Sequence, residues 1–195
     1  MRAPILHQLH APAGIRRPLV APCALLLVWA TGCRAPQAEA SQRPGEPGLV
    51  AWVQAAAEAR LEVGNVLDDW HAAASQADGE RYLGHIADEA SFLGTDAYER
   101  WDREAYELYV TSNFEGPNPG WTYLPQDRHI ELAPGGDLAW FDEVLERDGY
   151  REMRGTGILL RQDGRWRIAQ YNMSLTVPNE VAADVLSIIL SYRRG

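Results

Sequence analysis

Two Asp-Gly turns within residues 137–175 constrain the fold of this chain more than any other feature. They are Arg147-Asp148-Gly149 and Gln162-Asp163-Gly164, and residues typical of strands flank both. Asp followed by Gly is a strong signal for a β-hairpin, because Gly readily takes the positive φ that a three-residue loop with a bulge needs. The segment therefore predicts three consecutive antiparallel strands.

The turns also set the expected register. If each loop has three residues, counting in steps of two places Asp142 beside Arg154 and Arg154 beside Asn172. The next row of the same face holds Trp140, Thr156 and Gln170, and the face continues with Ile158, Leu160, Trp166 and Ile168. We expect the first six of these residues to line part of a ligand pocket, because their polar groups can pair with one another when buried.

The opposite face of the predicted sheet is almost entirely apolar. Helices can cover only one face, and an apolar face left in water would be an unusually large exposed patch. We therefore expect a homodimer whose contact includes Phe141, Met153, Leu159, Tyr171 and Met173. Gly155 and Gly157 are expected to let a bulky neighbour, Phe141 or Tyr171, pack across a bent strand.

Residues 1–32 have the features of a signal peptide of the lipoprotein type. Three arginines precede an apolar run, residues 23–30, which is too short to span a bilayer. Ala30-Thr31-Gly32-Cys33 then resembles a bacterial lipobox, whose cysteine becomes lipidated. An ordinary cleaved signal with an incidental cysteine is the alternative.

The segment after Cys33 reads as a tether. Residues 33–48 are rich in Pro, Gly, Ala and polar residues, which is typical of a linker. The protein is therefore expected in the cell envelope, on the periplasmic or another extracytoplasmic side, with the lipid anchor as its contact with the membrane.

Composition argues against several function classes. The formal net charge of −9 makes nucleic acid an improbable partner. Cys33 is the single cysteine after the leader, and no two histidines after the leader have the helical spacing of metal ligands, so we expect no metal site. The chain has neither a Gly-rich phosphate loop nor a Gly-x-Ser-x-Gly motif, and we expect no cofactor.

The rest of the chain predicts helices before and after the strands of the sheet. Within residues 49–75, apolar residues recur at intervals of three and four, as on one face of a helix. A short helix precedes the sheet, and residues 180–192 predict a final helix. Residues 49–192 are therefore expected to form one α+β domain, with its N-terminal helices packed on an antiparallel sheet.

Several segments resemble one known family. They are residues 94–101 (GTDAYERW), 139–143 (AWFDE), 154–157 (RGTG) and 163–172 (DGRWRIAQYN). Together they resemble a SnoaL-like domain of the nuclear transport factor 2-like superfamily over about residues 60–180. The resemblance implies a cone-shaped fold, in which helices close over a strongly curved antiparallel sheet, a pocket remains inside, and domains pair through their sheets.

The resemblance leaves the reaction open. The superfamily includes cyclases, isomerases and dehydratases as well as members without a known reaction, and one fold hosting many functions is common. No catalytic residue of these enzymes aligns with a particular residue of this chain. The site candidates therefore come from the residues themselves.

Asp142, Arg154 and His129 are the candidate catalytic residues. Asp142 could act as a general base that Arg154 orients, and a histidine on a strand could serve as acid or base. A structural ion pair between strands and an exposed strand histidine are the alternatives. Trp101 and Trp121 are expected to line the pocket with Trp140, since tryptophans suit flat apolar ligands.

Two functions are consistent with these features. The first is a lipid-anchored domain that binds a small, mostly apolar molecule without chemistry. The second is a cofactor-independent isomerase, cyclase or dehydratase that uses an Asp as general base. An enzyme requires a titratable group inside the pocket with a polar partner in reach, whereas a binding protein requires only the apolar lining.

The leader generates the first testable prediction. Mass spectrometry of the mature protein should find a diacylglyceryl group on Cys33 at the new N-terminus. Cys33→Ser should abolish that mass and release the protein from the membrane fraction. A mature wild-type chain that begins elsewhere without lipid would contradict the prediction.

Overall fold

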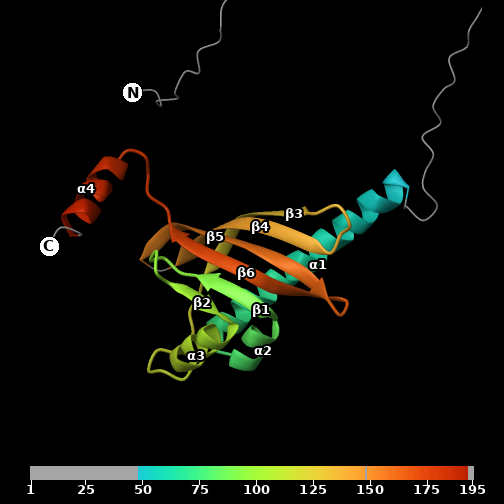
Figure 1. Cartoon of the computed structure of the whole chain (residues 1–195), viewed down its shortest axis with the longest axis horizontal. Coiled ribbons are helices and arrows are strands. Elements are labelled where there is room, and N and C mark those ends of the chain that lie inside the picture. Colours follow the sequence, from blue (N-terminus) through green and yellow to red (C-terminus); the bar gives the residue numbers. More distant parts are fainter. Residues whose placement is uncertain (1–47, 148, 193–195) are drawn as a thin grey trace, which may run out of the picture. The chain divides into compact units, whose positions relative to one another are not determined.

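The computed structural model describes residues 48–147 and 149–192. The elements are α1 (Leu49–Ser75), α2 (Gly79–Gly84), β1 (Ile86–Leu93), β2 (Arg100–Asp102), α3 (Arg103–Phe114), β3 (Leu124–Leu132), β4 (Leu138–Arg147), β5 (Tyr150–Gln162), β6 (Arg165–Leu175) and α4 (Ala182–Tyr192) (Figure 1). The predicted signal peptide, Cys33 and nearly all of the predicted tether lie outside the described residues. Among the described helices, none is both long enough and apolar enough to cross a bilayer.

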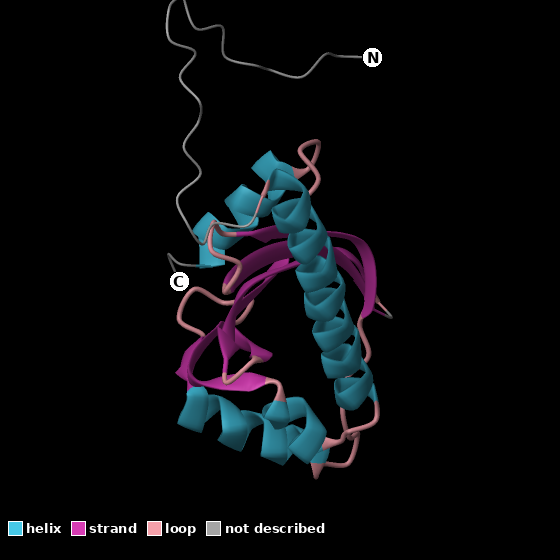
Figure 2. Ribbon diagram, turned by 90° about the vertical axis from the view of Figure 1, so that its right-hand side faces the viewer, coloured by secondary structure: helices cyan, strands magenta, loops and turns pink. Residues whose placement is uncertain are grey.

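The six strands form one curved sheet in the order β2-β1-β6-β5-β4-β3. Neighbouring strands are antiparallel, except that β1 runs parallel to β6. The long helix α1 lies along the concave side of the sheet (Figure 2). This architecture confirms the predicted α+β cone.

Helix α1 packs against the sheet through one apolar stripe. Six of its eight buried side chains recur at intervals of three and four residues: Ala56, Ala59, Val63, Leu67, Trp70 and Ala74. The carboxylate of Asp69 then ties α2 to α1, because it accepts hydrogen bonds from the Arg81 guanidinium and lies 2.6 Å from Nε2 of His85. The bonds from Arg81, with a smaller contribution from His85, lower the pKa of Asp69 to about 2.

The hairpin turns are present, but their loops are shorter than predicted. Arg147 pairs with Tyr150 and Gln162 pairs with Arg165, so each loop has two residues. In the second loop, Asp163 and Gly164 have φ angles of +50° and +75°, as a two-residue type I′ turn requires.

The predicted register is therefore wrong by two residues over most of the sheet. Asp142 pairs with Thr156, which pairs with Asn172, while Arg154 lies opposite Val144 and Ser174. Each shorter loop moves the register by one residue, and an irregularity further along each hairpin moves it by one more. These irregularities lie near Glu152, whose φ is +61°, and at Ala169. Because side chains alternate between the two faces of a strand, a register shift of two residues leaves each side chain on its predicted face.

The segment between the second turn and Ala169 is shifted by one residue only. Trp166 and Ile168 were predicted on the polar face, but both are buried on the core face. The remaining members of the two predicted faces keep their sides, because the register beyond Ala169 differs by two.

The apolar face packs against the helices within one protomer. Phe141, Met153, Leu159 and Tyr171 are buried in the core, and Met173 is partly buried against it. The predicted dimer contact through these residues is therefore wrong. The predicted role of the glycines is confirmed, since a Cβ on Gly157 would lie 2.6 Å from the Phe141 ring and one on Gly155 would lie 2.6 Å from the Tyr171 hydroxyl.

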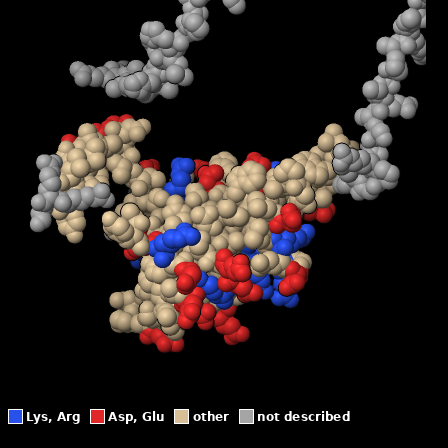
Figure 3. Space-filling model, in the orientation of Figure 1, with Lys and Arg blue, Asp and Glu red and all other residues tan. Residues whose placement is uncertain are grey.

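We propose instead that two copies pair through the outer face of the sheet. Figure 3 looks onto this face, where a broad area across the sheet carries few charged atoms. Its apolar members include Trp140, Val144, Ile158 and Leu160, and Trp140 is 46% exposed.

Trp140→Glu should convert the dimer to a monomer, because it places a charge in the centre of the proposed contact. Light scattering on residues 49–195 measures this. Trp52→Glu is the matched control, since Trp52 on α1 is 44% exposed and should leave the dimer intact. A wild-type domain that is monomeric at micromolar concentration would contradict the proposal.

Candidate functional site

A cavity of about 390 Å³ lies on the core side of the sheet, between the sheet and the first three helices. Nine aromatic side chains line it: Trp70, Tyr82, Phe92, Trp101, Tyr106, Tyr109, Trp121, Tyr123 and Tyr171. Its volume is within the range of small-molecule sites. The polar side chains on its wall include His71, Glu99, Asn113, Asn118 and Arg147.

The aromatic rings support one another. Phe92 stacks on Tyr106 with ring centroids 3.6 Å apart, and Trp101 stacks on Tyr109 at 5.2 Å. Deeper in the domain, Trp70 stacks on Tyr82 at 4.9 Å. Interlocked rings of this kind form a preformed apolar surface that suits a flat ligand.

A buried ionic network adjoins the cavity. Nε2 of His71 lies 2.8 Å from Oε1 of Glu143, and Nε of Arg128 donates to Oε2 of the same carboxylate at 2.7 Å. Nη1 of Arg128 also donates to Asp68 at 2.7 Å and to the carbonyl oxygen of Gly64 at 3.2 Å. The network thus joins α1, β3 and β4.

Glu143 is fully buried, but its partners keep it ionised. Burial alone would raise the pKa of Glu143, yet the bonds and charges of His71 and Arg128 outweigh this effect and lower the pKa below its ordinary value. Burial, reinforced by the charge of Glu143, raises the pKa of Tyr171 well above its usual range. Glu143 is therefore a carboxylate at neutral pH, and Tyr171 is a neutral phenol.

The network fixes the orientation of His71 on the cavity wall. An ionised carboxylate can only accept hydrogen bonds, so Nε2 of His71 carries the proton that points at Glu143, and Nδ1 is the nitrogen left for acid–base chemistry. We find no hydrogen bond to Nδ1 from the described residues. A neutral imidazole that is oriented by a carboxylate can act as a general base, and the carboxylate then stabilises the imidazolium.

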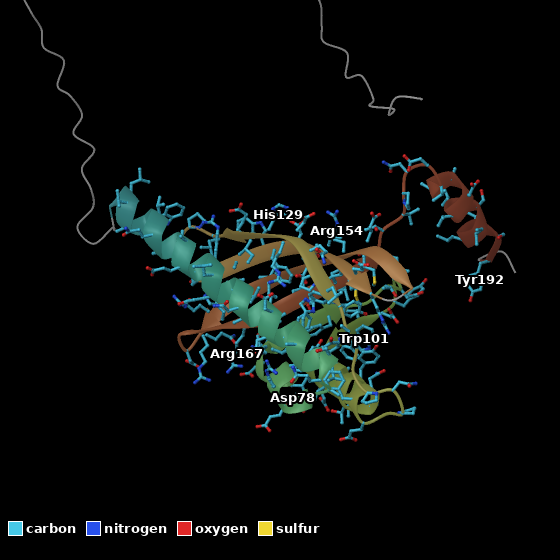
Figure 4. The ribbon with its side chains drawn as sticks, turned by 180° about the vertical axis from the view of Figure 1, so that it is seen from behind. Asp78, Trp101, His129, Arg154, Arg167 and Tyr192 are labelled. Carbon is cyan, nitrogen blue, oxygen red and sulfur yellow. The ribbon has the colours of Figure 1, made fainter. Side chains whose placement is uncertain are left out.

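The predicted polar rows lie elsewhere. Trp140, Asp142, Arg154, Thr156, Gln170 and Asn172 occupy the outer face of the sheet, whereas the cavity adjoins the opposite face. The expectation that these six residues face the pocket is therefore wrong. His129 is exposed and pairs with Asp142 across the β3–β4 ladder. Figure 4 shows His129 and Arg154 well away from Trp101.

Two predicted pocket residues do line the cavity. Trp101 comes from β2, and Trp121 comes from the segment between α3 and β3. Trp121 packs edge-on against Phe114 and Tyr82, with ring centroids 4.8 Å and 5.7 Å away.

Sequence reasoning missed His71, Glu143 and Arg128. Glu143 had a usable signal, because it occupies a period-two position between Phe141 and Leu145 on an otherwise apolar strand face. A single charge there indicates a buried pair. His71 had a weaker signal, since it follows Trp70 beside the apolar stripe of α1.

No cluster of three or more His, Cys, Asp or Glu side chains that could hold a metal ion is found in residues 48–147 and 149–192. The buried histidine has a carboxylate and a guanidinium beside it instead of further metal ligands. His71 and Glu143 are themselves acid–base groups, so these side chains can transfer protons.

Residues 63–178 match the family profile of the SnoaL-like domain. The chain belongs to the SnoaL-like family. No functionally curated protein matches its sequence significantly. The family assignment agrees with the observed cone and with the predicted nuclear transport factor 2-like superfamily.

Solved structures share this fold at low sequence identity. A nuclear transport factor 2-like protein of unknown function from Pseudomonas putida has 17% identity and a TM-score of 0.55, covering 64% of this chain and 92% of its own. A provisionally named scytalone dehydratase from Novosphingobium aromaticivorans has 11% identity and a TM-score of 0.54, covering 64% and 89%. A provisionally named aromatic ring hydroxylase from the same species has 16% identity and a TM-score of 0.54, covering 63% and 92%. These similarities establish the fold alone.

Glu143→Gln should destabilise the domain at neutral pH by about 3–5 kcal/mol, because it removes the buried carboxylate that His71 and Arg128 share and leaves Arg128 with the exposed Asp68 as its carboxylate partner. The folded-state pKa of Glu143 is lowered, so its stabilisation is present above the unfolded-state pKa and is lost as the pH falls through the folded-state value. The wild type should therefore approach the variant in stability as the solution is acidified below about pH 4.5.

Urea denaturation between neutral pH and about pH 3 measures both effects. Asp142→Asn is the matched control, since Asp142 precedes Glu143 in the same strand but lies on the outer face. A Glu143→Gln midpoint equal to that of the control at neutral pH would show that the network contributes little.

Proposed function

We propose that the cavity binds a small, mostly apolar molecule that contains a flat ring. The aromatic side chains on the wall and the volume of about 390 Å³ support this, and the polar side chains beside the rings can orient the ligand. This proposal does not depend on any reaction.

We further propose that the protein catalyses cofactor-independent proton transfer on that molecule. The observation that carries this proposal is the buried pair of His71 and Glu143 on the cavity wall. The predicted base Asp142 is replaced by His71 in this role. The reaction class remains that of an isomerase, cyclase or dehydratase.

In this mechanism, Nδ1 of His71 removes a proton from a carbon next to a carbonyl group, and the electron pair of the broken C–H bond forms an enolate. Returning the proton to another carbon completes an isomerisation. Delivering it instead to a departing hydroxyl group, as the enolate electrons form a carbon–carbon double bond, releases water. Glu143 stabilises the imidazolium in both cases, and Arg128 holds Glu143 in position.

The tyrosines of the cavity could stabilise the enolate oxygen. The hydroxyl oxygens of Tyr82 and Tyr106 are 2.7 Å apart, so one hydroxyl donates to the other and the second keeps a proton to donate. Burial raises the pKa of both phenols, which therefore stay protonated at neutral pH. Neutral donors in a dry site are effective for a developing oxyanion.

The proposal can be tested without the natural substrate. The full chain should accelerate exchange of the α-protons of 2-tetralone, an aromatic ketone, with deuterium oxide, as nuclear magnetic resonance measures. His71→Gln should slow the catalysed exchange about 10²- to 10⁴-fold, because the general base is lost.

His129→Gln is the control, since His129 is an exposed histidine on the sheet and should leave the exchange rate unchanged. Exchange that survives in His71→Gln would reject His71 as the base. If 2-tetralone binds the wild type without faster exchange, the binding proposal stands and the proton-transfer proposal fails.

A further inference from the structure

The cavity has an inner part that is buried in the domain and an outer part that reaches solvent. Buried lining residues include His71, Tyr82 and Tyr171, whereas Tyr109 and Arg147 are exposed. Arg147 is the last residue of β4. It is the only Arg or Lys among the described residues that line the cavity.

Arg147 is held over the entrance by Tyr123. The guanidinium carbon lies 5.5 Å from the centroid of the Tyr123 ring, and Nη1 donates to the Tyr123 hydroxyl at 3.3 Å. This contact fixes the plane of the guanidinium but uses only one of its five N–H donors.

Several other arginines of the domain have carboxylate partners. Arg128 bonds to Glu143 and Asp68, and Arg60 bonds to Glu131. For Arg147, the described residues supply the phenol of Tyr123 and no carboxylate within salt-bridge distance. Among the described residues, the position of a carboxylate partner at the cavity entrance is thus left for a ligand.

The acidic residue of the cavity wall is already engaged. Oε2 of Glu99 accepts a hydrogen bond from the backbone N–H of Asp96 at 3.0 Å, which closes its own turn. Burial raises the pKa of Tyr109, and the charge of Glu99 adds to this rise while that of Arg147 opposes it. Both charges therefore act at the outer part of the cavity, with opposite signs.

We propose that the ligand is an aromatic or similarly flat ring that carries a carboxylate, and that Arg147 binds this carboxylate at the entrance while the ring enters the cavity. The proposal rests on the proposed binding function of the cavity. Arginine suits the role, since its planar fork of donors matches a carboxylate in a bidentate pair. The carboxylate outside and the ring inside would direct the far edge of the ligand toward the buried wall that contains His71.

The test compares two probes of nearly identical shape, 2-naphthoate and 2-naphthamide, by isothermal titration calorimetry on the full chain. The wild type should bind 2-naphthoate at least about tenfold more tightly than the neutral amide, because charge-assisted hydrogen bonds are stronger than neutral ones. Arg147→Gln should remove this preference and leave the affinity for 2-naphthamide within about twofold of the wild type.

Arg154→Gln is the matched control, since Arg154 is an exposed arginine on the outer face of the same sheet and should keep the preference. Equal wild-type affinities for the two probes, or a preference that survives in Arg147→Gln, would overturn this inference alone and leave cavity binding intact. Failure of both probes to bind would overturn this inference together with the binding proposal. Deuterium exchange in His71→Gln reports separately on the proposed chemistry.

Discussion

Glu143 holds a negative charge in the centre of the domain, where its side chain has no contact with solvent. Removing such a charge from water costs several kcal/mol unless close partners offset the cost. The partners are Arg128 from β3 and His71 from α1, so the charge is stable only when helix and sheet have docked in one arrangement. The same contact that favours this docking also places an oriented imidazole on the wall of the cavity.

Much of the architecture could be predicted from local sequence patterns. The apolar stripe of α1 and the two Asp-Gly turns identify the helix and the hairpins, because each signal is local. Loop length could not be read with the same certainty, since Asp-Gly fits loops of two and of three residues. The assignment of the apolar face to a dimer failed for a related reason: the sequence shows that the face must be covered, but it does not show by what.

The site was predicted less well than the fold. Trp101 and Trp121 were recognised because large aromatic side chains in a small domain commonly lie in the core or on the wall of a pocket. The pairing of His71 with Glu143 depends on how α1 crosses β4, 72 positions further along the chain, and no local pattern specifies that crossing. The charge of Glu143 on an apolar strand face was the available signal. Without it, the site was predicted on the polar outer face instead.

The irregularity at Ala169 has a consequence for comparing distant relatives of this fold. Side chains on opposite sides of that residue follow different inside–outside phases along β6, so a gap placed in the turn instead of at the irregularity would exchange wall-lining and solvent-facing positions over part of a strand. At identities of 11–17%, sequence scores alone give little guidance on where such a gap belongs. Equivalent residues in these proteins are therefore better identified by superposing the strands and their pairings than by sequence alignment.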